Sequence, residues 1–197
     1  MSLEVLSTAA AVGTFIVIAA TAVAAIFQLA HLRASNQLSA LVGIGSIFFN
    51  REMMRALDAL RIQLPNKVQD PDFRRMLEVG PVKIEENPEL AILVWTEMIG
   101  VFLKRGIVSE DVLLDWNGTV YLSWWAACAG TIAVLRRRNP SAYENFEYLA
   151  SRAKRRYAQR PRGSFPAGTE RMPLSDPWLA TDHAGEASAV GAGTRSG

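Results

Sequence analysis

Cysteine, histidine and known catalytic motifs are scarce in this sequence of 197 residues. The single cysteine, Cys128, excludes an intrachain disulfide, and no set of Cys and His residues matches the spacing of a zinc site. The two histidines, His31 and His183, are far apart in the chain and are not expected to meet. We find no P-loop, glycine-rich dinucleotide turn, nucleophile elbow or His-Glu-x-x-His motif. The sequence therefore predicts no catalytic residue, no metal site and no cofactor.

Charge is missing from the first long stretch of the chain. Val5 to Leu32 spans 28 residues without an Asp, Glu, Lys or Arg. About 20 helical residues, each rising about 1.5 Å, cross a hydrocarbon core of about 30 Å. The nine Val, Ile, Phe and Leu residues between Ala11 and Ala30 favour insertion by about 3–5 kcal/mol. This stretch predicts a transmembrane anchor.

A cleaved signal peptide is the alternative for the same stretch, because Ala22-Val23-Ala24 could serve as a cleavage site. However, the residues before the apolar run include Glu4 and no Lys or Arg, so the basic start of a signal peptide is missing. We therefore favour an uncleaved anchor. Since Arg33 and Arg51 follow the run, the positive-inside rule predicts a single-pass membrane protein whose carboxyl-terminal domain is cytoplasmic.

A second uncharged stretch, Asn117 to Leu135, is 19 residues long and could be a second span. Three arginines, Arg136 to Arg138, follow it directly. If the first span leads into the cytoplasm, a second span would place these arginines outside, against the positive-inside rule. We therefore predict that this stretch forms the buried centre of a helical bundle, although contact with lipid stays open.

Helical periodicity and capping residues organise the body of the chain. Apolar residues from Leu38 to Leu64 recur at helical spacing, which predicts one long helix continuing from the anchor, with this apolar face toward the body and an end at Pro65-Asn66. A capping side chain followed by proline occurs three times and predicts further helices. These are 71–79, 88–105 and 140–157, and Ser109 is expected to begin a short turn to Leu114.

The end of the chain differs in composition. From Arg160 onward it is rich in Pro, Gly, Ala, Ser and Thr and cannot bury enough apolar surface to offset its ordering entropy. The predicted fold class is all-α, because no convincing strand pattern occurs. We expect a transmembrane anchor and juxtamembrane segment at 1–36, a small cytoplasmic helical bundle at 37–158 and a disordered tail at 159–197.

Three segments of the chain form one recognisable pattern. The apolar start runs into Gln28-Leu29-Ala30-His31-Leu32-Arg33, and Leu103-Lys104-Arg105-Gly106-Ile107-Val108 ends a helix that contains Glu97. Tyr143-Glu144-Asn145-Phe146-Glu147-Tyr148-Leu149-Ala150 closes the pattern, which covers about 12–156. This pattern resembles the bacterial family called domain of unknown function 4760. The resemblance implies a single membrane anchor followed by a compact helical domain, which we expect in the bacterial inner membrane, and it brings no known activity or site residue.

Three kinds of side chain are candidates for chemistry. Glu97 lies in an otherwise apolar segment and could do acid–base work, but on a helical wheel it belongs to a polar edge, and we favour that structural role. Cys128 lies among small residues, which favours a buried apolar side chain over a nucleophile. His31 is expected to mark the membrane interface.

Acidic and aromatic clusters allow two further alternatives. Glu85 and Glu86, with Glu89 nearby, could bind a cation, but we favour a solvated helix start. Tryptophans could form a pocket, although core packing or a membrane-interface belt is the favoured interpretation. They are Trp116, Trp124 and Trp125.

Basic residues gather in the last third of the chain, where 136–162 contains nine basic and two acidic residues. Seven of them are expected to lie at two nearby helix ends. A solvated face that complements the helix dipoles is the favoured interpretation, anionic lipid headgroups are the alternative, and nucleic acid is the least favoured partner. The seven are Arg136, Arg137, Arg138, Arg152, Lys154, Arg155 and Arg156.

Taken together, the sequence predicts a single-span membrane protein whose helical domain is an interaction or scaffold module. Its expected partners are the bilayer and either an unidentified protein or a second copy of itself. The alternative is a membrane-tethered enzyme or small-ligand sensor with a pocket near Trp116, Trp124 and Glu97.

Overall fold

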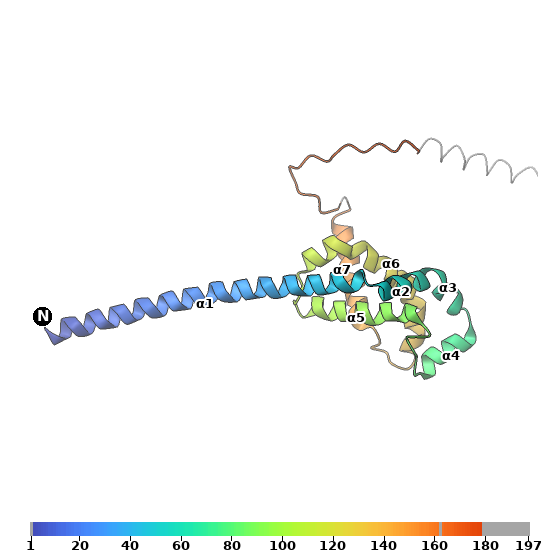
Figure 1. The fold of residues 1–197 in the computed structure, drawn as a ribbon, viewed down its shortest axis with the longest axis horizontal. Helices are drawn as coiled ribbons and strands as arrows, with labels where there is room; N and C mark the ends of the chain where they lie inside the picture. Colours follow the sequence, from blue (N-terminus) through green and yellow to red (C-terminus); the bar gives the residue numbers. More distant parts are fainter. Residues whose placement is uncertain (1, 162, 179–197) are drawn as a thin grey trace, which may run out of the picture. The chain divides into compact units, whose positions relative to one another are not determined.

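The computed structural model describes residues 2–161 and 163–178 (Figure 1). Within these residues the chain forms helices and no strand, which confirms the all-α prediction. The chain divides into two units, 1–161 and 162–197. Residues 163–178 of the second unit contain neither helix nor strand, and the rest of the predicted disordered tail, 179–197, lies outside the described residues.

The helices are α1 (Leu3–Phe48), α2 (Arg51–Ile62), α3 (Leu64–Lys67), α4 (Pro71–Val79), η1 (Pro88–Leu90), α5 (Ala91–Lys104), α6 (Glu110–Arg136) and α7 (Glu144–Gln159).

Helix α1 is 46 residues long, which corresponds to about 69 Å. Its amino-terminal part extends away from the other helices in Figure 1 (blue), residues 10–36 are exposed, and Ile44 is its first buried residue. Both α1 and α6 are long and apolar enough to cross a membrane, but 39% of the apolar window of α6 is buried in the protein, against 0% for α1. The structure therefore places α6 in the bundle and leaves the apolar part of α1 uncovered.

The predicted long helix from the anchor to Leu64 is interrupted at Phe49 and Asn50. The Oδ1 atom of Asn50 accepts a hydrogen bond from the backbone N–H of Glu52, 3.0 Å away, and so caps a new helix, α2. Pro65 and Asn66, predicted to end the helix, lie inside the short helix α3. Proline is tolerated there because the first residues of a helix have no intrahelical partner for their N–H groups.

Only one of the three predicted proline-associated caps forms as expected. Asp70 caps α4, and its Oδ1 atom accepts from the backbone N–H of Asp72 at 2.9 Å. Asn87 does not cap the next helix, because its Oδ1 atom accepts from Lys67. Asn139 binds the N–H of Ser141 within a turn, and α7 begins only at Glu144. The predicted start of the last helix at 140 was therefore four residues early.

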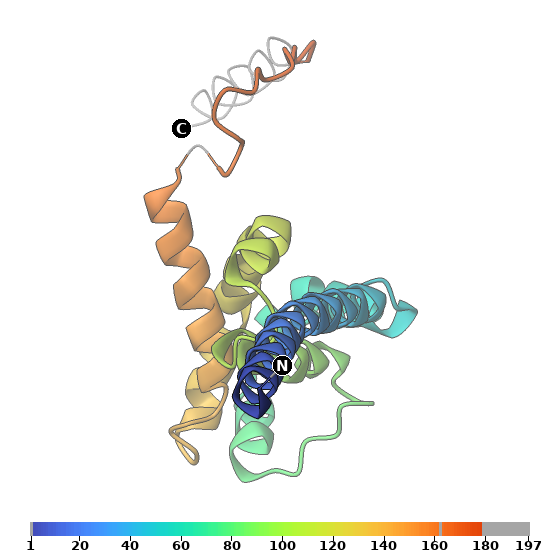
Figure 2. The ribbon, with the colours of Figure 1, turned by 90° about the vertical axis from the view of Figure 1, so that its left-hand side faces the viewer.

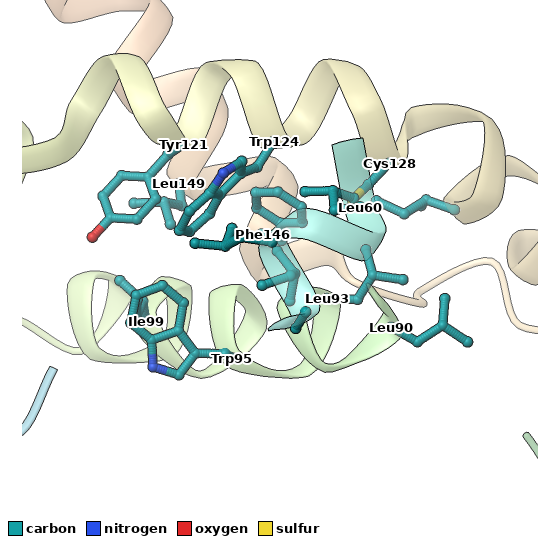
Figure 3. Close-up of a cluster of buried hydrophobic side chains, with 14 of the residues drawn as sticks. Leu60, Leu90, Leu93, Trp95, Ile99, Tyr121, Trp124, Cys128, Phe146 and Leu149 are labelled. Atoms are coloured by element: carbon teal, nitrogen blue, oxygen red, sulfur yellow. The ribbon is translucent and has the colours of Figure 1, made fainter. Parts of the chain in front are cut away.

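The aromatic residues of α6 form the centre of the bundle. The helix is continuous from Glu110 to Arg136 with a kink at Asn117, so the predicted separate turn ending at Leu114 is its first part. Tyr121, Trp124 and Cys128 face the core, where they meet residues of α5 and α7 (Figure 3). This confirms that 117–135 packs in the bundle, with its other face exposed.

Helices α5 and α7 cross at very close range (Figure 2). Gly100 of α5 lies against the backbone of Asn145 in α7, and a Cβ atom added at Gly100 would overlap the Asn145 carbonyl group. Any side chain larger than hydrogen at residue 100 would therefore push the two helices apart.

We expect Gly100→Ala to destabilise the bundle by about 1–3 kcal/mol or more, because rigid backbone atoms cannot move aside for the added methyl group. The measurement is the thermal unfolding midpoint of the full chain in detergent, followed by circular dichroism. Gly43→Ala is the matched control, since nothing lies within 4 Å of its Cβ position. An equal midpoint for the two variants would contradict the tight crossing.

Candidate functional site

The carboxylate of Glu97 caps α7 from the neighbouring helix α5. Its Oε2 atom accepts from the backbone N–H of Phe146 at 2.8 Å, and its Oε1 atom accepts from the Nδ2 and backbone N of Asn145 at 2.7 and 3.4 Å. The local cap position, Tyr143, has a left-handed backbone and makes no side-chain cap bond. Glu97 thus supplies acceptors for backbone N–H groups that no local side chain caps at the start of α7, and its charge adds to that of Glu144 and Glu147 in the first turn. Its role is structural, as the polar-edge interpretation predicted.

Tyr143 lies beside Glu97 at an open surface hollow of about 610 Å³ that Arg138 also lines. Burial raises the pKa of the Tyr143 hydroxyl, and the negative charge of Glu97 acts in the same direction. At neutral pH the phenol is therefore protonated, so it can take part in hydrogen bonds as a donor or as an acceptor. It cannot act as a base there.

The acidic cluster at 85–89 divides into two environments. Glu85 and Glu86 are exposed, whereas Glu89 is fully buried, which corrects the prediction of a solvated cluster. The Nζ atom of Lys67 lies 2.8 Å from Oε1 of Glu89 and 3.2 Å from Oδ1 of Asn87. This ion pair ties α3 to the start of α5. In residues 2–161 and 163–178, no group of three or more His, Cys, Asp and Glu side chains is placed to hold a metal ion.

Cys128 and His31 lie in different environments. Cys128 is completely buried, and this burial raises the pKa of its thiol to about 12. The thiol is therefore protonated near neutral pH and is a poor nucleophile, which agrees with the apolar role predicted for it. His31 is exposed on α1, and His183 lies outside the described residues.

The tryptophans are distributed over three places. Trp124 is in the core, with ring centroids 5.8 Å from Phe48 and 5.7 Å from Trp95. Trp125 packs edge-on against Phe146 at 5.2 Å. Trp116 lies at the surface and is 41% exposed. Since Trp116 and Glu97 border different hollows and Trp124 is buried, the predicted pocket near these three residues is not assembled.

Most of the predicted basic cluster is engaged within the fold. Arg136 pairs with Glu147 at 2.7 Å, Arg137 with Glu78 at 3.2 Å and Arg152 with Glu110 at 2.5 Å, while Arg156 pairs with Asp111 and Asp115. Arg138 donates to the carbonyl oxygen of Val79 at 2.7 Å. The expectation that the two basic runs lie close together is wrong. Because α6 and α7 are antiparallel, 136–138 lies near the start of α7 and 152–156 near the start of α6.

Two cations of the predicted basic cluster, Lys154 and Arg155, have no such partner. Both are exposed, and neither makes an ion pair or hydrogen bond with another residue of the described chain. Arg155 borders a polar hollow of about 280 Å³ together with Gln159 and Arg160. Contact with an anionic surface stays a prediction, and these two residues are the ones available for it.

The most unusual surface lies where α1 meets the bundle. Between residues 38 and 49 the predicted apolar face divides in two. Leu41, Gly45 and Phe48 turn toward the bundle, while the remaining apolar residues of the predicted face in this range point outward. We call the outward members the α1 stripe, and they are Leu38, Val42 and Phe49, which are 64%, 63% and 75% exposed.

An apolar groove of about 270 Å³ runs beside the α1 stripe. It is formed by Leu41, Val42 and Gly45 of α1 and by Val112 and Trp116 of α6. Sequence reasoning missed this surface because it assigned all apolar residues of the segment to one buried face. Leu38, Val42 and Phe49 are separated by four and seven residues, a spacing that places them on a face of their own.

Substitution of Glu97 tests its capping role. We expect Glu97→Gln to lower the free energy of unfolding by about 1–2 kcal/mol, because the amide has only one acceptor and no charge for the start of α7. Denaturant unfolding of the full chain in detergent measures this, with the exposed Glu86→Gln as control. A variant as stable as the wild type would contradict the capping role and favour a chemical one.

Comparison with known proteins identifies the family of this chain but assigns it no activity. A family model described as a domain of unknown function (DUF4760) matches residues 15–153. No curated protein and no solved structure matches the sequence. The match includes most of α1, the whole α5–α7 crossing and the apolar groove, so these features belong to the region that defines the family. The chain is therefore a member of the DUF4760 family of helical domains of unknown function.

Proposed function

We propose that this protein is a single-span protein of the inner membrane whose helical domain lies in the cytoplasm and serves as an interaction or scaffold module. The observation that carries the proposal is the continuous helix α1, whose apolar part is covered by no other part of the described chain. Each Val, Leu, Ile or Phe left in water forgoes about 1.5–3 kcal/mol of burial free energy. A bilayer removes this cost.

The continuity of α1 supports a position of the bundle beyond the headgroups. Leu32 ends the uncharged run and Ile44 is the first buried residue of α1, with no break between them. These 12 residues span about 18 Å. The headgroup layer on each side of a bilayer is only about 5–8 Å thick. With Leu32 at the edge of the hydrocarbon core, a helix of this length would hold the bundle beyond the headgroups, where other proteins could reach it.

The polar side chains of the bundle support a binding role over a catalytic one. The two oxygens of Glu97 serve α7, Glu89 pairs with Lys67, and the Cys128 thiol is buried and protonated. In contrast, the groove and the α1 stripe are apolar and accessible. Such a surface is typical of contacts with another protein.

Membrane fractionation tests the anchor. Val17→Arg combined with Ala20→Arg places two charges in the middle of the run, at about 2.5–3.5 kcal/mol each, so we expect the variant to shift from the membrane pellet to the soluble or degraded fraction. Ser35→Arg with Asn36→Arg is the control, because it adds the same charge beyond Leu32. Recovery of the wild type without detergent would refute the anchor, and a reporter at Gly197 active only outside the cell would reverse the orientation.

Anionic headgroups are a second candidate partner, supported by the cations Lys154 and Arg155, which have no ion-pair or hydrogen-bond partner within residues 2–161 and 163–178. Each contributes about 1 kcal/mol near an anionic surface, so Lys154→Ser with Arg155→Ser should weaken binding of detergent-solubilised full chain to phosphatidylglycerol liposomes by up to about 30-fold. Arg51→Ser with Arg55→Ser removes the same charge from α2 and is the control. Equal binding by both variants would reject a specific contact.

A further inference from the structure

One face of α1 carries no Asp, Glu, Lys or Arg along the whole helix, within the proposed span and beyond it. Gly13, Ala20 and Ala24 and the α1 stripe, Leu38, Val42 and Phe49, follow one another at separations of 7, 4, 14, 4 and 7 residues. At 3.6 residues per turn, all six lie within about 40° of one another around the helix. The stripe is therefore the continuation of a small-residue face of the apolar run.

The charged residues of α1 lie on the side of the helix opposite the α1 stripe. Glu4 and Arg33 are the only Asp, Glu, Lys or Arg residues between 1 and 50, and they lie about 180° and about 160° from the centre of the stripe. His31 is the one titratable residue on the face. A face without fixed charge can meet an identical face without repulsion, which is the condition that a contact between two copies must satisfy.

With the proposed anchor ending at Leu32, lipid would not reach the outer part of this face. Val42 and Phe49 follow Leu32 by 10 and 17 residues, which corresponds to about 15 and 25 Å along the helix. Both distances exceed the headgroup layer of about 5–8 Å. The bundle does not cover it either, since Ile44 and Phe48 point to the bundle while Leu38, Val42 and Phe49 are exposed.

We infer that the α1 stripe binds the α1 stripe of a second copy of this chain, in a parallel dimer. This inference rests on the proposed function, because the anchor gives every copy the same orientation and brings equal residues to the same depth. Gly13, Ala20 and Ala24 allow the two spans to approach closely, while Leu38, Val42 and Phe49 bury one another in the aqueous part. The groove beside Val42, bordered by Val112 and Trp116, receives the partner's apolar side chains.

Disulfide cross-linking of the full chain in native membranes tests the dimer. Single cysteines replace Leu38, Val42 or Asn36 in a Cys128→Ala background, and mild oxidation is followed by non-reducing electrophoresis. Asn36 is the control because it is exposed on the same helix but about 140° from the stripe. A disulfide needs Cβ atoms about 3.5–4.5 Å apart, so we expect at least about fivefold more covalent dimer at 38 and 42 than at 36.

A second variant tests the non-covalent contact. Val42→Arg places equal charges opposite one another and should convert the dimer into a monomer, read as the protein mass in mild detergent by light scattering. Asn36→Arg should leave the dimer intact. Both residues are exposed, so circular dichroism should be unchanged. A wild-type protein that is already monomeric would overturn the inference, as would equal cross-linking at 36, 38 and 42.

These outcomes separate the two proposals. If the protein remains in the membrane fraction but shows neither site-specific cross-linking nor a dimer mass, self-association is wrong and the anchored module stands. If the full chain is soluble without detergent, the anchor itself is wrong, whatever its oligomeric state.

Discussion

The close approach of α5 and α7 is the constraint on which the bundle depends. At Gly100 the two helices touch backbone to backbone, and one turn earlier Glu97 receives the N–H groups that begin α7. The two features support each other, because the carboxylate can reach these N–H groups only when no side chain separates the helices. With α7 fixed in this way, Phe146 and Leu149 enter the core beside Trp124 and Cys128 (Figure 3).

The same arrangement explains why charged residues of the bundle offer little chemistry. Antiparallel packing brings the basic end of α7 to the acidic start of α6, so Arg152 and Arg156 pair with Glu110, Asp111 and Asp115. These pairs are partly buried, since the side chains of Arg152 and Arg156 are 35% and 10% exposed, and they fix the register of α7 against α6. The buried Glu89 is held by Lys67, and loss of one partner from such a pair typically costs about 3–5 kcal/mol. These charges maintain the fold.

The sequence predicted what depends on local pattern and missed what depends on distant neighbours. The apolar run, the all-α class, the Asp70 cap of α4 and the packing of 117–135 in the bundle follow from composition, capping chemistry and periodicity. The start of α7 could not be predicted, because its cap is Glu97, 47 residues before Glu144. Asn87 looked like a local cap but binds Lys67 of another helix. The distribution of Leu38, Leu41, Val42 and Phe48 between buried and exposed faces likewise depends on where α6 packs.

Continuity between the apolar run and the bundle has a mechanical consequence. No proline lies between Leu3 and Phe48, and the helix is unbroken over that range. A tilt or rotation of the apolar part is therefore transmitted to Ile44 and Phe48, which pack in the core. The break at Asn50 comes only after this contact, so it lies inside the bundle and does not uncouple the two parts. A continuous helix of this kind fixes the direction of its apolar part relative to the bundle, which a flexible linker could not do. Any partner that binds the outer face of α1 is held in the same geometry, since that face belongs to the same rigid helix.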